Sequence, residues 1–234
     1  RDLHSFPTRR SSDLIVVAAA RAVMLGGNER LGVYGWLIAL IVAEAAFFVF
    51  GLLPLLMFIL DRRHNPYKVL AAFAAPALVS LTFGHTYAQG GVALRHLKES
   101  LGVRRRSSAV VMPVALALGR AGTAMVTATI FVAVINSYSS LGLDSSTIVW
   151  MMVWVPLATL LLGAAPAAGP VVALGGLCAA YGRGFESGYV LLVPAMLPLT
   201  LLAAFVDAIM VAGITTSVAG KADDAAPKSL RHFI

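Results

Sequence analysis

The chain has 234 residues, of which 59% are apolar and only 12% are charged, and its mean hydropathy is +0.85. Soluble domains carry roughly 25% charged residues, so this composition excludes a disordered chain, a nucleic-acid-binding domain and an ordinary soluble globule. Most of the chain is therefore expected to lie in lipid. The net charge of +7 is expected to mark the loops on the cytoplasmic side.

The first residues differ in character from the rest. The run from His4 to Leu14 resembles the translation of a common short-read sequencing adapter, and it joins an apolar stretch without a transition. Residues 1–14 are accordingly expected to be non-native, and the remainder is expected to be a fragment. A genuine polar tail is the alternative.

Residues 15–60 are expected to contain the end of one transmembrane helix followed by one full helix. Ile15–Leu25 is a short apolar run, and Leu31–Leu60 carries a single charge, Glu44. As a helix, the second run would be about 45 Å long at 1.5 Å per residue, which exceeds a hydrocarbon core of about 30 Å. This helix is therefore expected to tilt or to project from the bilayer.

Residues 66–102 are expected to form a re-entrant hairpin. Val69–Leu94 contains no Asp, Glu, Lys or Arg, and the strongly basic stretch Arg95–Arg106 follows it. A single crossing would place that basic stretch outside, against the positive-inside tendency, whereas entry and exit on one side remove the conflict. Glycines and polar residues in Phe83–Gly91 are expected to break the helix and form the turn.

The same reasoning applies to the second half. A helix over 107–135 is expected to cross outward. The uncharged stretch Ser145–Gly182 is too long for one span of about 20 residues and too short for two. A second hairpin over 147–182, broken at Gly163–Pro170, is therefore expected to enter from the outside, and a helix over 187–220 to return inward.

Two hairpins that enter from opposite sides, each followed by a full helix, form an inverted repeat, as found in secondary transporters. The expected fold class is therefore an all-α polytopic membrane protein with a partial transporter fold. Its core is expected to span residues 61–222, with 223–234 as a cytoplasmic tail.

Five short motifs follow one another along this core: Asn65-Pro66, Leu94–Val103, Pro113, Gly122-Thr123 and Pro166–Gly169. Their order and spacing resemble the dicarboxylate/amino acid:cation symporter family, the glutamate transporter homologues. The likeness is to the C-terminal half of that family, from the entry of its first hairpin to its last helix. The chain therefore resembles a divergent C-terminal fragment of such a transporter.

The resemblance implies cation-coupled symport of a small organic solute such as a dicarboxylate or amino acid. It implies sodium or a proton as the coupling ion, and no cofactor. The protein is expected to be multi-pass in a bacterial-type inner (plasma) membrane with a cytoplasmic C-terminus. Its partners would be the solute and the lipid bilayer, with no nucleic acid, and the full-length protein would be a homotrimer.

The chain departs from the family at its functional motifs. His85–Gln89 stands where the family has a serine-rich hairpin tip, and Gly119-Arg120-Ala121 stands in place of Asn-Met-Asp. In Leu197–Val211, where the family carries two Asp, an Arg and an Asn, this chain offers only Asp207.

The candidate site residues come from the hairpin tips, the central motif and the last helix. The candidates for substrate binding are His85, Thr86, Gln89, Arg120, Thr123, Pro166 and Gly169. The candidates for cation coupling are Asp207 and Gly119, and no metal other than sodium is expected.

Arg120 is the charge that stands out, because an ionisable residue deep in a span is costly and marks function by default. Three interpretations are open: it contacts an anionic solute, it pairs with Asp207 as a buried lock, or it extends to the interface. For Thr123, the alternatives are a contact with the solute and a hydrogen bond to its own helix backbone.

Two rival functions are considered beside transport. One is a divergent homologue with a regulatory or partner-binding role, which the lost motif residues would favour. The other is an intramembrane enzyme, which needs a nucleophile, a base or a metal set at one depth; the sequence offers no such set, so an enzyme is not expected.

Overall fold

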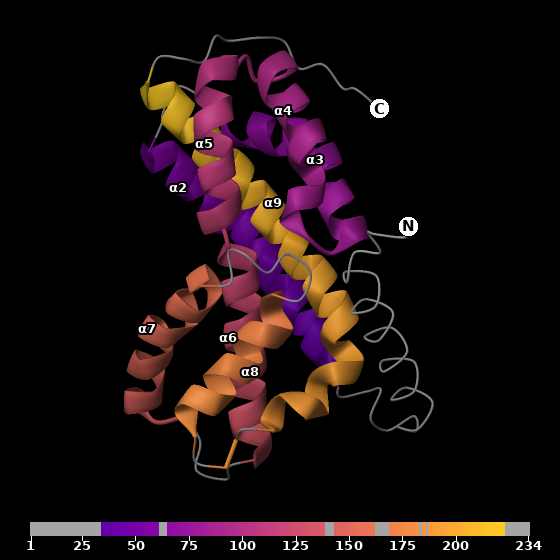
Figure 1. Ribbon diagram of the computed structural model, residues 1–234, viewed down its shortest axis with the longest axis vertical. Helices are drawn as coiled ribbons and strands as arrows, with labels where there is room; N and C mark the ends of the chain where they lie inside the picture. Colours follow the sequence, from indigo (N-terminus) through magenta and orange to yellow (C-terminus); the bar gives the residue numbers. More distant parts are fainter. Residues whose placement is uncertain are drawn as a thin grey trace, which may run out of the picture.

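The structure is a computed structural model that describes residues 34–60, 65–138, 143–161, 169–182, 184–185 and 187–222. The regular elements of these ranges are helices (Figure 1), and four helices are long and apolar enough to cross a membrane: Tyr34–Leu60, Pro66–Phe83, Arg105–Ser137 and Met196–Lys221. The all-α polytopic membrane fold is confirmed. The features expected within residues 1–33 and 223–234 lie outside the described residues.

The first long helix, Tyr34–Leu60, contains one wide turn. Its second half comprises the π-helix η1 (Phe48–Leu52) and α2 (Leu53–Leu60). Pro54 has no amide hydrogen to give to the carbonyl of Phe50, four residues earlier. The hydroxyl of Tyr67 donates to that carbonyl over 3.2 Å, which ties the wide turn to the next helix.

The first hairpin consists of α3 (Pro66–Phe83), the short 3₁₀ helix η2 (Thr86–Gln89) and α4 (Gly90–Glu99). Gly84 ends α3 with φ of 68°, a left-handed conformation that glycine adopts without strain. By length and composition α3 qualifies as a full span. The chain nevertheless turns back at Gly84, and α4 runs beside α3 (Figure 1).

The start of the hairpin allows a direct test of helix capping. The side-chain oxygen of Asn65 accepts the amide hydrogen of Tyr67 at 3.0 Å, and Pro66 occupies the first turn. Asn65→Ala is expected to destabilise the protein by about 1 kcal/mol because an amide at the helix start loses its acceptor. Thermal unfolding in detergent measures this effect, and Asn65→Asp, which keeps an acceptor, is the control. Equal midpoints for Asn65→Ala and the wild type would contradict the cap.

The single helix expected over 107–135 is wrong, because this membrane-spanning segment is a broken helix. It comprises α5 (Arg105–Leu118) and α6 (Ala121–Tyr138), with Gly119 and Arg120 between them. At Gly119 a Cβ atom would lie 2.5 Å from the carbonyl oxygen of Ala115 and 3.1 Å from Val211, so the break requires glycine. The backbone is thereby interrupted in the middle of the span.

The second hairpin comprises α7 (Ser145–Leu161) and α8 (Gly169–Tyr181). Aromatic rings hold its two arms against α6: Trp150 stacks on Phe131 at 5.7 Å between ring centroids and meets Tyr181 edge-on at 5.1 Å. The predicted break at Gly163–Pro170 lies largely outside the described residues.

The last segment differs in detail from the single helix expected over 187–220. It begins as the 3₁₀ helix η4 (Gly188–Ala195) and continues as α9 (Met196–Lys221). Pro194 and Pro198 each lack an amide hydrogen, so neither can donate an α-helical bond. Pro198 falls in the first turn of α9, where such a donor is not needed.

The buried apolar residues of the described ranges form two clusters, one in each half of the molecule. The first hairpin, α2, α5 and the C-terminal half of α9 build one cluster; α6, the second hairpin and the N-terminal half of α9 build the other. Three continuous segments pass from one half to the other (Figure 1): Tyr34–Leu60, α5–α6 and α9. A polar contact also ties the first of these to the second, because Thr129 donates to Glu44 at 2.7 Å.

Candidate functional site

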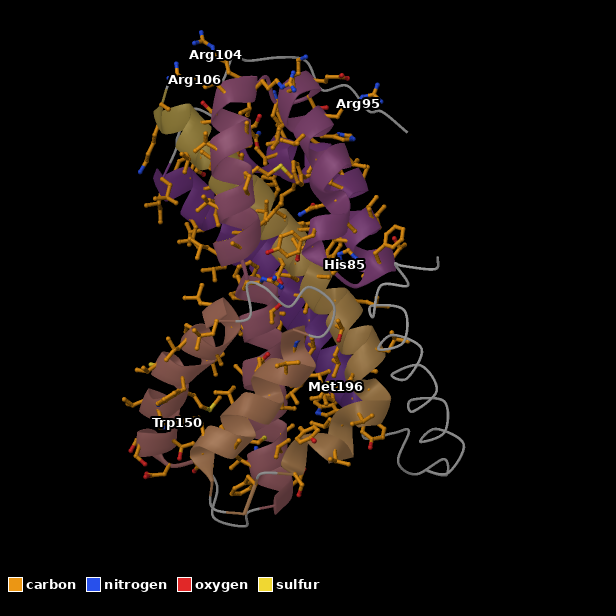
Figure 2. The ribbon with its side chains drawn as sticks, in the orientation of Figure 1. His85, Arg95, Arg104, Arg106, Trp150 and Met196 are labelled. Carbon is orange, nitrogen blue, oxygen red and sulfur yellow. The ribbon has the colours of Figure 1, made fainter. Side chains whose placement is uncertain are left out.

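A small polar cavity lies where the hairpins, the helix break and the middle of α9 meet. Its volume is about 10 Å³, room for about one water molecule. The lining residues are Gly84, His85, Thr86, Arg120, Thr123, Gly169, Pro170, Thr200, Ala203, Ala204 and Asp207. Figure 2 shows His85 near the middle of the long axis, far from the arginines at one end.

The predicted site residues largely converge on this cavity. His85, Thr86, Arg120, Thr123, Gly169 and Asp207 all line it. Gln89 lies fully buried on the same hairpin, and Gly119 is buried at the break, but neither is among the lining residues. Pro166 lies outside the described residues.

Asp207 holds the start of α6. One carboxylate oxygen accepts the amide hydrogens of Gly122 at 2.6 Å and Thr123 at 3.1 Å, and the other accepts the hydroxyl of Thr123 at 2.5 Å. The first amides of a helix have no partner within the helix and carry a partial positive charge, so a carboxylate stabilises them. Asp207 on α9 therefore stabilises the start of α6, the second part of the broken helix.

The same contacts rule out one interpretation of Thr123, a side-chain hydrogen bond to its own helix backbone. Its hydroxyl donates to Asp207 and not to the backbone of its own helix. Its amide is also directed to Asp207, so the carbonyl of Gly119, four residues earlier, does not receive the hydrogen bond that a continuous helix would give it.

Arg120 is buried, with only 5% of its surface exposed, so it does not extend to the membrane interface. No ion pair joins it to Asp207 within 4.0 Å, although both residues belong to the described part of the chain. The direct ion pair expected of a buried Arg120–Asp207 lock is therefore absent between these two described residues, because the amides and hydroxyl at the start of α6 engage the carboxylate instead.

The guanidinium of Arg120 lies by an aromatic ring, and two of its nitrogens have no hydrogen-bonding partner among the described residues. Its Cζ atom lies 5.6 Å from the ring centroid of Tyr87, within the range of a cation–π interaction. Nε and Nη2 are buried and, among the described residues, have no hydrogen-bond acceptor. Buried guanidinium donors without acceptors are costly, and they suit a carboxylate that arrives from outside.

The first hairpin adds uncharged polar groups. The hydroxyls of Ser80 and Thr86 and both amide atoms of Gln89 are buried without a partner in the described structure. His85 is occupied, since its Nδ1 accepts the amide hydrogen of Ala88 at 3.1 Å. This bond caps η2 and leaves Nε2 as the ring nitrogen available for other contacts.

Sequence reasoning missed Thr200, Ala203 and Ala204. These residues precede Asp207 by seven, four and three positions, respectively, which places them on the same face of α9. Helical spacing from Asp207 would have found them. Near Ala203 the start of α6 approaches α9 closely. A Cβ atom at Gly122 would lie 2.5 Å from the carbonyl oxygen of Ala203.

A larger groove of about 890 Å³ beside η1 and the start of α3 is lined mainly by apolar and aromatic residues such as Phe47, Phe50 and Tyr67. None of the described residues that line it is charged. No group of three His, Cys, Asp or Glu side chains gathers to bind a metal in the described ranges. The polar cavity, with its buried charges, is therefore the candidate site.

A model of the sodium:dicarboxylate symporter family matches residues 14–200. The chain belongs to this family. Comparison with curated proteins finds no match. The family match includes both hairpins, the broken helix and Arg120, and it ends before Asp207.

Membership of the sodium:dicarboxylate symporter family establishes the general function. The protein is a multi-pass membrane transporter of a family that moves small organic solutes together with a cation. It is not an enzyme. The cation is a transported ion and not a cofactor. The solute and the lipid bilayer are its partners.

Proposed function

We propose that this symporter carries a small organic solute, of the dicarboxylate or amino acid kind, whose carboxylate is held by Arg120. The observation that supports the proposal is the buried guanidinium of Arg120, which lines the cavity and has two donor atoms without an acceptor among the described residues. A planar guanidinium matches the two oxygens of a carboxylate, and burial strengthens the attraction.

The other contacts would come from the two hairpin turns and the start of α6. His85, Thr86 and Gln89 would supply polar groups from the first hairpin, and Gly169 would allow close backbone approach from the second. Pro166, also predicted to bind the solute, lies outside the described residues. Thr123 lines the same cavity and donates its hydroxyl to Asp207. The cavity of about 10 Å³ is too small for an organic solute, so loading requires the hairpins to move apart.

The coupling ion, sodium or a proton, would be bound by Asp207 and the carbonyl of Gly119. Asp207 is the acidic residue among the cavity-lining groups, and the Gly119 carbonyl lies at the helix break without its regular helical donor. Oxygen ligands of this kind suit a hard cation. Because Asp207 already accepts three hydrogen bonds, ion binding would alter the start of α6.

The basic residues support an orientation in the membrane. Figure 2 shows Arg95, Arg104 and Arg106 together at one end of the molecule. By the positive-inside tendency this end is cytoplasmic. The C-terminus would then be cytoplasmic, in a bacterial-type inner membrane. The resemblance in sequence supports a homotrimer for the full-length protein.

The test is uptake into proteoliposomes by variants of Arg120. Arg120→Ala is expected to lower uptake at least about 30-fold, the cost of removing one partner of a buried charge pair. Arg120→Lys, which keeps the charge but loses the planar fork, is expected to be intermediate. Arg106→Ala, at an exposed position away from the cavity, is the control. Full activity of both Arg120 variants would contradict the role.

A further inference from the structure

Both hairpins place a residue close to the guanidinium of Arg120. On the first hairpin, Tyr87 belongs to η2, and the centroid of its ring lies 5.6 Å from the Cζ atom of Arg120. On the second hairpin, a Cβ atom at Gly169 would lie 3.9 Å from Nη1 of Arg120. The side chain of Arg120 therefore has neighbours on two different hairpins.

The two nitrogens of Arg120 without an acceptor among the described residues are Nε and Nη2. These atoms adjoin each other on one edge of the planar guanidinium. Their N–H bonds on that edge form a fork that matches the two oxygens of a carboxylate. The ring of Tyr87 attracts the guanidinium through its π-electrons and does not occupy an N–H donor as an acceptor atom would. Ring and carboxylate can therefore bind Arg120 at the same time.

The backbone of η2 fixes where the ring of Tyr87 lies. Nδ1 of His85 accepts the amide hydrogen of Ala88 at 3.1 Å, and the amide of Gly90 donates to the carbonyl oxygen of Tyr87. Tyr87 belongs to neither apolar cluster, and 38% of its surface is exposed. Removing the ring is therefore expected to cost little core packing.

We propose that Tyr87 is a positioning residue for Arg120, whose guanidinium it holds with the Nε–Nη2 edge directed to the carboxylate of the solute. This inference rests on the proposed role of Arg120 as the carboxylate anchor. Arginine has a long side chain with many rotamers, and a contact that limits them in the empty site lowers the entropy lost on binding. Tyr87 acts on the solute through Arg120, so its loss weakens binding and leaves the transport step itself intact.

The experiment measures the concentration dependence of uptake into proteoliposomes by the full chain, with succinate and aspartate as the two probes. Tyr87→Leu is expected to raise KM at least about fivefold, with little change in the maximal rate. Tyr87→Phe keeps the ring and is expected to retain the KM of the wild type. Tyr67→Leu removes a ring at the other end of the same hairpin and is the control, with KM unchanged.

A double-mutant cycle distinguishes positioning from a merely structural role. Arg120→Lys keeps the positive charge but has no planar fork to orient. Tyr87→Leu is therefore expected to raise KM by a smaller factor in the Arg120→Lys background than in the wild type. A structural effect on the hairpin would raise KM by the same factor in both backgrounds.

The outcomes separate this inference from the proposed function. An unchanged KM for Tyr87→Leu, an equal factor in both backgrounds, or a Tyr87→Phe variant as impaired as Tyr87→Leu would overturn the positioning role, while the anchor stands if Arg120→Ala still loses uptake. Wild-type uptake by Arg120→Ala, or no uptake of either probe by the wild type, would overturn both. Unfolding midpoints verify folding, and Tyr87→Met serves as the second variant without a ring if Tyr87→Leu fails to fold.

Discussion

Asp207→Ala is expected to destabilise the folded protein by about 3 kcal/mol or more. The substitution leaves the amides of Gly122 and Thr123 without an acceptor in the protein interior, and it removes the negative charge from the start of α6. Asp207→Asn keeps one acceptor oxygen and is expected to fall between alanine and the wild type. The measurement is the midpoint of thermal unfolding in detergent.

A double-mutant cycle with Thr123→Val sharpens this prediction. Because Thr123 donates its hydroxyl to Asp207, the two losses are expected to be less than additive. Val218→Ala, on the exposed side of the same helix, controls for a general sensitivity of α9. An Asp207→Ala variant as stable as the wild type would show that the carboxylate does not hold α6.

Gly122→Ala is expected to cost about 3 kcal/mol through overpacking. A Cβ atom at this position would lie 2.5 Å from the carbonyl oxygen of Ala203, 2.6 Å from Cβ of Val206 and 3.0 Å from the amide nitrogen of Asp207. These are mostly backbone atoms that cannot rotate away, so α6 must move off α9 and its bonds to Asp207 must lengthen.

The matched control is Gly176→Ala on α8. A Cβ there meets nothing within 4 Å, and alanine favours the helix by about 1 kcal/mol relative to glycine. The control is therefore expected to be neutral or stabilising in the same unfolding measurement. Equal behaviour of the two variants would mean that the close approach of α6 to α9 does not constrain position 122.

The distribution of charge was the most informative part of the sequence. Uncharged stretches of unusual length, flanked by basic residues, predicted that Val69–Leu94 turns back, and the structure has this turn at Gly84. The break at Gly119 and Arg120 was not predicted, because one helix was expected over 107–135. The signal for the turn arises from the high cost of charge in lipid.

The partner of Asp207 was beyond sequence reasoning. Opposite charges suggested Arg120, but the groups that bind Asp207 are mainly backbone amides. Every residue other than proline has such an amide, and only the helix break at Gly119 leaves these two free to bond. Which amides lie free depends on the exact position of the break and on how closely α9 approaches it.

The two separate apolar clusters have a consequence for how the protein responds to its solute. The candidate cavity lies between the two halves of the molecule, each of which has its own apolar cluster. The continuous segments Tyr34–Leu60, α5–α6 and α9 join these halves. A solute held between Arg120 and the hairpin turns would add cohesion across this junction. Amide hydrogens on both sides of the junction should then exchange more slowly together when the solute is bound, while exchange deep within each block changes little.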